Sequence, residues 1–120
     1  MKTIFVVDDN NINLVAADET LSDSYNVFTF ASAMTMFEVL NDIIPDLILL
    51  DILMPDIDGF EALKRLKADM QYAQIPVIFL TSKNDANTEA RGFEMGAVDF
   101  IFKPFSAPVL LNRIKAHLQE

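Results

Sequence analysis

Four short apolar runs in this 120-residue chain each end in a polar residue that can take part in chemistry. The residues that follow the runs are Asp8 and Asp9, then Asp51, Thr81 and Lys103. A run of this length fits a strand buried on both faces, as in parallel sheets covered by helices. One such residue would be a coincidence, but four favour parallel strands that deliver their end groups to one edge of a sheet.

Segments with helical periodicity separate these runs. We predict strands over residues 3–8, 26–30, 46–51, 76–80 and 98–102, and helices over about 11–22, 33–43, 59–70, 87–95 and 107–118. Strands that alternate with helices predict an α/β fold in which helices cover both faces of a parallel sheet. The strand over 26–30 alternates polar and apolar residues, so we expect it at the edge of the sheet.

Apolar residues at helical spacing predict which face of each helix is buried. The expected inward-facing residues are Leu14, Ala17 and Leu21; Phe37, Leu40 and Ile44; Phe60, Leu63, Leu66 and Met70; Ala90 and Phe93; and Leu110, Ile114 and Leu118. Asp58 and Ser106 are expected to cap the starts of the third and fifth helices, and Gly96 the end of the fourth.

Composition limits the class of protein. The chain is 52% hydrophobic and 22% charged, which fits one ordered domain over residues 1–120. It has no cysteine, no apolar run long enough for a bilayer and no signal-peptide cleavage pattern, so we expect a cytoplasmic protein without a membrane partner. Its net charge of −9 repels phosphate backbones, so direct nucleic-acid binding is not expected.

The residues after the strands meet the requirements of phosphoryl chemistry. The carboxylates of Asp8, Asp9 and Asp51 suit a hard cation with oxygen ligands, above all Mg²⁺, with Mn²⁺ as an alternative. A carboxylate can attack phosphorus without a base because it is ionised at neutral pH. Lys103 and Thr81 would neutralise and orient the phosphoryl oxygens. Each residue alone is better explained as part of a turn or cap or as a solvated or core side chain, and only their joint placement indicates phosphoryl chemistry.

Longer motifs surround these residues. They are Val7-Asp8-Asp9-Asn10, Asp51-Ile52-Leu53-Met54-Pro55-Asp56, Asp58-Gly59, Leu80-Thr81-Ser82, Gly96-Ala97 and Lys103-Pro104-Phe105. Together they resemble the response-regulator receiver domain of two-component signalling over essentially the whole chain. The resemblance implies a flavodoxin-like fold with a five-stranded parallel sheet in the order 2-1-3-4-5, which places the first and third strands side by side.

The resemblance also assigns roles at the site. Asp51 would accept a phosphoryl group from a phosphohistidine on a sensor histidine kinase or a histidine phosphotransfer protein. Asp8, Asp9, Asp51 and the backbone carbonyl of Leu53 would hold Mg²⁺. Lys103 would pair with the phosphate, and the peptide bond between Lys103 and its following proline would be cis.

A conformational switch is implied as well. Thr81 would move toward the phosphoryl group, and Phe100 would turn inward as Thr81 leaves its space. The change would alter the face formed by the fourth helix, fifth strand and fifth helix, which would act on an attached output domain, on a downstream protein or through a homodimer. Asp99 and Arg113 match the charges through which some DNA-binding regulators pair, but Val109 stands where those regulators carry an acid.

Four further positions are particular to this chain. Leu53 and Lys83 occupy positions that set the lifetime of the phosphorylated form in such domains, and Leu53 cannot hydrogen-bond an attacking water. Ile12 is expected beside the site, where a histidine-bearing helix would dock. His117 is expected on the surface, in the last turn of a helix, where a cation suits the helix dipole.

Two other functions use the same residue types. A phosphatase of the haloacid dehalogenase class needs a nucleophile after the first strand in an Asp-x-Asp pattern, which residues 8–11 do not provide. A receiver-like interaction module that works without phosphorylation usually lacks one of the key groups, and here all are present. We therefore expect a signalling phosphoacceptor rather than a turnover enzyme, either as a single domain or as the N-terminal part of a longer regulator or hybrid protein.

Overall fold

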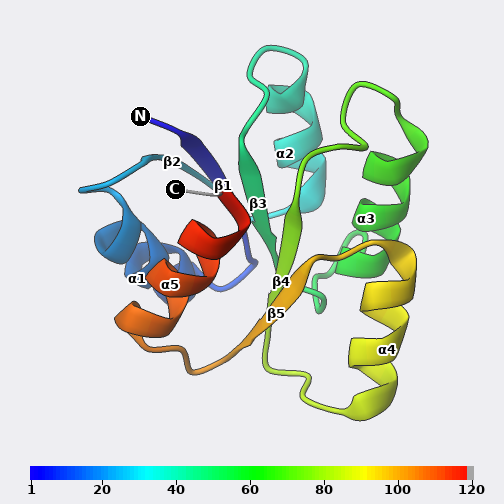
Figure 1. Ribbon diagram of the computed structural model, residues 1–120. Helices are drawn as coiled ribbons and strands as arrows, with labels where there is room; N and C mark the ends of the chain where they lie inside the picture. Colours follow the sequence, from blue (N-terminus) through cyan, green and yellow to red (C-terminus); the bar gives the residue numbers. More distant parts are fainter. Residues whose placement is uncertain (119–120) are drawn as a thin grey trace.

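The computed structural model describes residues 1–118 as alternating strands and helices (Figure 1). The strands are β1 (Thr3–Val7), β2 (Asn26–Phe30), β3 (Leu47–Leu50), β4 (Val77–Thr81) and β5 (Asp99–Phe102). The helices are α1 (Asn11–Leu21), α2 (Ala33–Leu40), α3 (Gly59–Ala68), α4 (Ala86–Met95) and α5 (Ala107–Leu118). The element order is the one predicted from the sequence.

The strands form one parallel sheet in the order β2-β1-β3-β4-β5. β1 lies between β2 and β3, with Val7 in register with Phe30 on one side and with Leu50 on the other. This register brings the carboxyl ends of β1 and β3 together, as the resemblance implied. β2 and β5 are the two edges, and the polar alternation of β2 reflects its position there.

Helices cover both faces of the sheet, as predicted (Figure 1). α1 and α5 pack on one face through a core that includes Leu14, Leu21, Leu110 and Ile114. α2 and α3 pack on the other face, with α4 beside them, around a second core that includes Phe79. The central strands β1, β3 and β4 are buried on both faces because each face has its own helix layer.

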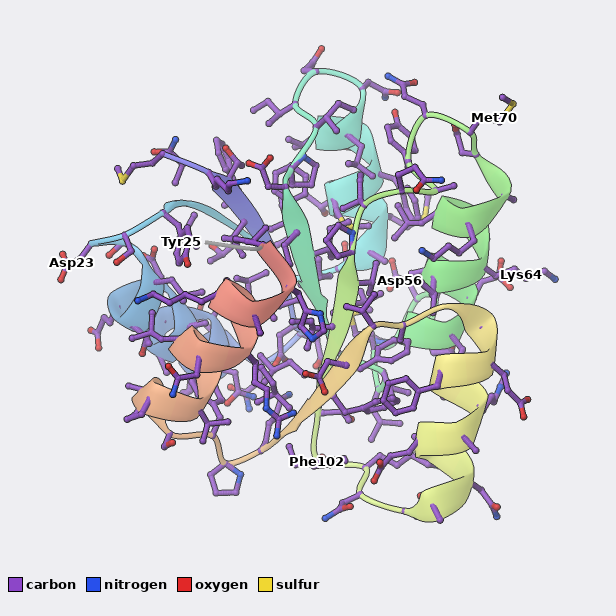
Figure 2. All side chains as sticks on the ribbon, viewed as in Figure 1. Asp23, Tyr25, Asp56, Lys64, Met70 and Phe102 are labelled. Atoms are coloured by element: carbon purple, nitrogen blue, oxygen red, sulfur yellow. The ribbon has the colours of Figure 1, made fainter. Side chains whose placement is uncertain are left out.

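Two helices end earlier than the apolar pattern predicted. α2 ends at Leu40, and Ile44 is 46% exposed rather than inward-facing, because the proline after it disfavours helical backbone at that position. α3 ends at Ala68, where Asp69 adopts an extended conformation. Met70 is 94% exposed and points away from the domain (Figure 2). In both cases an apolar residue continued the helical spacing beyond the real end of the helix.

The predicted inward stripe of α4 is also wrong. Ala90 and Phe93 are exposed, and the buried residues of this helix are Thr88 and Gly92. The helix lies close to the sheet at Gly92, where a Cβ atom would be 2.9 Å from Cε1 of Phe100 and closer still to Cζ of the same ring. Glycine allows this approach, so the contact face of α4 is marked by a small residue rather than by large apolar ones.

Gly92→Ala is therefore expected to destabilise the domain by about 1–2 kcal/mol, because the new Cβ displaces the Phe100 ring or the helix. A loss of stability would be informative, because replacing glycine by alanine inside an ordinary helix stabilises the helix by up to about 1 kcal/mol. Urea unfolding of wild type and variant measures the difference. A stabilised variant would contradict the close packing of α4 on Phe100.

None of the helices within residues 1–118 is both long enough and apolar enough to cross a membrane.

Candidate functional site

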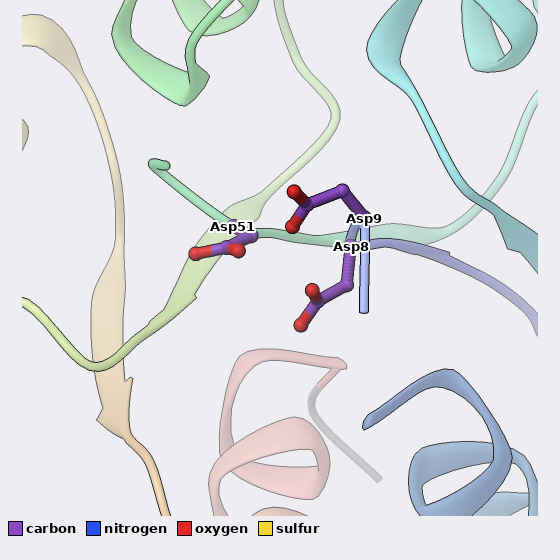
Figure 3. A group of neighbouring side chains, drawn as sticks. All are labelled: Asp8, Asp9 and Asp51. Carbon is purple, nitrogen blue, oxygen red and sulfur yellow. The ribbon is translucent and has the colours of Figure 1, made fainter. Parts of the chain in front are cut away.

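Three carboxylates meet at the carboxyl ends of β1 and β3 (Figure 3). One carboxylate oxygen from each of Asp8, Asp9 and Asp51 lies within 4.8 Å of the others. Asp8 is fully buried and Asp51 is 4% exposed, whereas Asp9 is exposed to solvent. The structure thus brings together the three acidic residues that the sequence predicted as a cation site.

Backbone hydrogen bonds beyond the strand ends hold the acidic residues in place. The Asp8 amide donates to the Phe30 carbonyl at 3.0 Å, and the Asp51 amide donates to the Val7 carbonyl at 2.9 Å. Asn10 caps α1, and its own amide donates to Oδ1 of Asp8 at 2.9 Å. These bonds fix the backbone of Asp8 and Asp51 at the ends of their strands.

Lys103 is the counter-charge of the site. Its Nζ lies 2.6 Å from Oδ2 of Asp8 and 3.3 Å from Oδ2 of Asp51. Oδ2 of Asp8 is buried without a hydrogen bond, so the ammonium is its ion-pair partner. One ammonium cannot balance three carboxylates, and the remaining negative charge favours a divalent cation with oxygen ligands. The peptide bond between Lys103 and Pro104 is cis, as implied by the resemblance.

Burial alters the acidity of Asp51. Removal from solvent and the nearby Asp8 carboxylate raise the pKa of Asp51 from 3.8 to about 6, against the opposing effect of Lys103. The carboxyl group is mainly ionised at neutral pH and becomes protonated in mildly acidic solution. The folded domain therefore disfavours the charged form of Asp51 relative to the unfolded chain.

A pocket of about 460 Å³ opens over the carboxylates. Its lining includes Asp8, Asp9, Asp51, Leu53, Ser82, Lys103 and Pro104. Leu53 is 52% exposed at this pocket, and its amide donates to Oδ1 of Asp51 at 3.4 Å. The pocket is large enough for a small ligand, and Leu53 is the apolar residue that lines it next to the Asp51 carboxylate.

Thr81 directly precedes Ser82, which lines this pocket, and Phe100 lies on the neighbouring strand β5. Thr81 is fully buried at the end of β4, and its hydroxyl accepts a hydrogen bond from the Lys83 amide at 3.1 Å. Phe100 is 3% exposed, with its ring centroid 5.3 Å from that of Phe79 and 5.1 Å from that of Phe93. The ring is thus turned inward and packed between β4 and α4.

An ion-pair cluster on β5 and α5 was only partly visible in the sequence. Asp99 contacts Arg113 at 2.9 Å and His117 at 3.0 Å. Arg113 was recognised as a candidate for pairing between molecules, but here it is bonded to Asp99 of its own chain. His117 was expected on the surface and is in fact part of this cluster. The signal available was the spacing of Arg113 and His117, which puts both on one face of a helix.

The chain matches the family model of the response regulator receiver domain over residues 4–115. Among curated relatives, a probable cyclic di-GMP phosphodiesterase of Vibrio cholerae is 41% identical over 117 residues, covering 98% of this chain and 26% of that protein. The phosphate regulon transcriptional regulatory protein PhoB of Pseudomonas aeruginosa is 39% identical over 119 residues, covering 98% of this chain and 52% of PhoB. The chain thus spans about a quarter and about half of these relatives.

Solved structures agree with this match. A BeF3-activated DrrB receiver domain superposes with a TM-score of 0.91 at 32% identity, covering 100% of this chain and 99% of that domain. The chemotaxis protein CheY4 of Vibrio cholerae superposes with a TM-score of 0.92 at 28% identity, covering 97% of this chain and 98% of CheY4. Fold, acidic pocket and family match coincide over nearly the whole length, and the chain belongs to the response regulator receiver domain family.

Proposed function

We propose that this receiver domain accepts a phosphoryl group on Asp51 from a phosphohistidine of a sensor histidine kinase or a histidine phosphotransfer protein. The observation that carries the proposal is the convergence of Asp8, Asp9 and Asp51 within 4.8 Å, together with a lysine ammonium 3.3 Å from Asp51. Receiver domains are signalling phosphoacceptors rather than turnover enzymes, and the buried carboxylates of Asp8 and Asp51 at the pocket agree with this role.

The transfer itself needs little from the protein beyond position and charge. A carboxylate oxygen of Asp51 attacks phosphorus, a P–O bond forms, and the P–N bond to the donor imidazole breaks. The imidazole nitrogen then takes a proton from solvent and leaves as neutral histidine. Lys103 is placed to neutralise the phosphoryl oxygens, because its ammonium already contacts both Asp8 and Asp51.

The acidic cluster fits Mg²⁺. The carboxylates of Asp8, Asp9 and Asp51 and the carbonyl of Leu53 would hold the ion, with Mn²⁺ as an alternative. The excess of negative charge supports this assignment, because the single Lys103 ammonium contacts Asp8 and Asp51 but cannot balance three carboxylates. A bound ion would supply positive charge for the phosphoryl oxygens as they approach Asp51.

Thr81 and Phe100 would transmit the phosphorylation of Asp51 to the surface of the domain. On phosphorylation the Thr81 hydroxyl would exchange its bond with the Lys83 amide for one with the phosphoryl group. Phe100 would then be held inward, in the position that it occupies between Phe79 and Phe93. The face formed by α4, β5 and α5 would present this state to an output domain, to a downstream protein or to a second copy.

Transfer from a phosphohistidine donor tests the proposal. A phosphorylated histidine phosphotransfer domain is mixed with wild type, Asp51→Asn and Asp56→Asn, with and without Mg²⁺. Asp56 is exposed and serves as a matched control. We expect the phosphoryl group to move to wild type and to Asp56→Asn in the presence of Mg²⁺, and not to Asp51→Asn. Transfer to Asp51→Asn would place the acceptor elsewhere.

Leu53 is expected to slow hydrolysis of the phosphorylated form. Its apolar side chain lies at the pocket and cannot hydrogen-bond an attacking water. Leu53→Asn should therefore shorten the lifetime of the phosphorylated protein several-fold, because the amide can orient an attacking water toward phosphorus. The decay of phosphorylated protein after removal of the donor measures this. An unchanged decay rate would indicate that the Leu53 side chain only packs in its loop and does not affect hydrolysis.

Ile12 is expected to help dock the donor. It is 78% exposed on α1 beside Asn13, which lines the pocket. Ile12→Ser should slow transfer from the histidine donor about tenfold, because an exposed apolar anchor contributes on the order of 1–2 kcal/mol at an interface. Phosphorylation by acetyl phosphate should not change, because this donor needs no docking surface. Equal losses with both donors would indicate a folding defect instead.

A further inference from the structure

Side chains cap the backbone of Phe100 at the outer edge of the sheet. β5 is the last strand in the order, so one side of its backbone has no neighbouring strand (Figure 1). The amide of Phe100 donates to Oδ1 of Asp99 at 2.8 Å. The carbonyl of Phe100 accepts from Nη1 of Arg113 at 3.0 Å. Both polar groups of this residue are thus bonded to charged side chains.

The two caps belong to one cluster, which we call the α5 clamp: Asp99, Arg113 and His117. Nη1 of Arg113 also contacts Oδ1 of Asp99 at 2.9 Å, and Nε2 of His117 lies 3.0 Å from Oδ2. The side chains of Asp99 and His117 are only 21% and 27% exposed, so these contacts are partly shielded from solvent. α5 therefore holds both oxygens of the carboxylate that caps the Phe100 amide.

The ring of Phe100 responds to the position of its backbone. It packs tightly against Gly92 of α4, where even a methyl group would collide with it. It also stacks on Phe102, with ring centroids 6.0 Å apart. The ring is only 3% exposed, so a shift of the Phe100 backbone would move a closely packed side chain.

We propose that Asp99, Arg113 and His117 are positioning residues that anchor the backbone of Phe100 and so favour the inward orientation of its ring. The inference rests on the proposed function, in which an inward Phe100 accompanies phosphorylation. Since the coupling between two sites is reciprocal, a clamp that favours the inward ring also raises the affinity of the pocket for a phosphoryl group. The clamp thus links α5 to the chemistry at Asp51.

If the α5 clamp only added stability, its removal should affect neither the position of Phe100 nor the pocket. Exposed ion pairs contribute little to stability and can be removed with little consequence. Arg65 offers a matched control, because it pairs with Glu61 on α3 at 3.0 Å and its side chain is 47% exposed, the same as that of Arg113. Arg65→Gln should change neither Phe100 nor the pocket. Arg113→Lys tests whether charge without the planar guanidinium is enough.

Hydrogen exchange and ligand affinity together test the clamp by NMR. The first measurement is the exchange rate of the Phe100 amide relative to that of Ile101, its neighbour on β5, in wild type, Arg113→Gln, Asp99→Asn, His117→Gln and Arg65→Gln. The second is the affinity for beryllofluoride, a phosphoryl analogue, at saturating Mg²⁺. The ratio to Ile101 removes any general loss of stability, which would raise both exchange rates together.

We expect Arg113→Gln and Asp99→Asn to speed exchange at Phe100 about tenfold relative to Ile101 and to weaken beryllofluoride binding about fivefold, with a smaller effect of His117→Gln. Arg65→Gln should match wild type. Unchanged exchange and affinity in Arg113→Gln and Asp99→Asn would overturn the proposal. If wild type binds no beryllofluoride, the proposed function fails. The exchange data then decide separately whether the clamp anchors Phe100: faster exchange upholds the anchoring and unchanged exchange overturns it.

Discussion

Replacing Lys103 by methionine is expected to destabilise the metal-free domain by about 3 kcal/mol, the lower end of the cost of removing one partner of a buried ion pair. The Lys103 ammonium contacts Asp8 at 2.6 Å and Asp51 at 3.3 Å, and the Asp8 side chain is fully buried. Without the ammonium, Oδ2 of Asp8 would be a buried charge with neither a hydrogen bond nor a counter-ion. Methionine keeps the length of the side chain, so the loss reports charge rather than packing.

Mg²⁺ should restore much of this stability. A divalent ion among the carboxylates replaces the missing positive charge, and it no longer competes with the ammonium for Asp8 and Asp51. We therefore expect Lys103→Met to bind Mg²⁺ more tightly than wild type, although it should accept a phosphoryl group more slowly. Thermodynamic linkage makes the gain in stability grow with the ratio of Mg²⁺ concentration to its Kd.

Urea unfolding with and without Mg²⁺ measures both effects. Lys64→Met is the matched control, because Lys64 is exposed on α3 and projects into solvent (Figure 2). The control should unfold like wild type in both conditions. Equal stability of Lys103→Met and Lys64→Met in the absence of metal would contradict the role of Lys103 as the counter-charge of the site.

Asp51→Asn should have the opposite effect on stability and should stabilise the metal-free domain. Burial and the Asp8 carboxylate raise the pKa of Asp51 from 3.8 to about 6, so the folded domain disfavours the charged form. A rise of this size corresponds to about 3 kcal/mol, which is the upper limit of the gain at neutral pH. Asparagine keeps the shape of the side chain and removes the charge.

The gain should depend on pH in a defined direction. A carboxyl group whose pKa is raised on folding stabilises the fold when protonated, and this contribution is lost as the pH rises through the folded pKa. Wild type and Asp51→Asn should therefore have similar stabilities near pH 4 and should diverge progressively up to about pH 7. The stabilising effect of Mg²⁺ should be large in wild type and small in the variant.

Stability curves for wild type, Asp51→Asn and Asp56→Asn across this pH range test the prediction. Asp56 is exposed, so its replacement should leave the pH dependence of wild type unchanged. A variant of Asp51 that is less stable than wild type at neutral pH without metal would show that its charge is well solvated or well paired, and that the cluster does not need a cation.

The acidic site was predictable from sequence because its residues follow strands. Asp8, Asp9 and Asp51 each come directly after an apolar run, and parallel strands place such positions at one edge. Periodicity also identified the buried face of α5, where Leu110 and Ile114 pack as expected. Strong local patterns and a shared strand direction fix these features without information from distant parts of the chain. The strand order itself came from the family resemblance.

Other features depend on contacts that periodicity does not contain. Ile44 and Met70 fit the helical spacing, but α2 ends at Leu40 and α3 ends at Ala68, so both residues lie beyond the helices and are exposed. α4 meets the sheet through Gly92, so a search for large apolar residues selected Phe93, which is exposed. The pairing of His117 with Asp99 depends on the angle between α5 and β5, which only the packed structure supplies.

The mass of the intact protein after incubation with acetyl phosphate and Mg²⁺ tests the central claim most directly. Wild type, Asp51→Asn and Asp56→Asn are compared, each also in the absence of metal. We expect one added phosphoryl group on wild type and on Asp56→Asn, none on Asp51→Asn, and none without Mg²⁺. A phosphoryl group on Asp51→Asn, or none on wild type with both acetyl phosphate and a phosphohistidine donor, would contradict Asp51 as the phosphoacceptor.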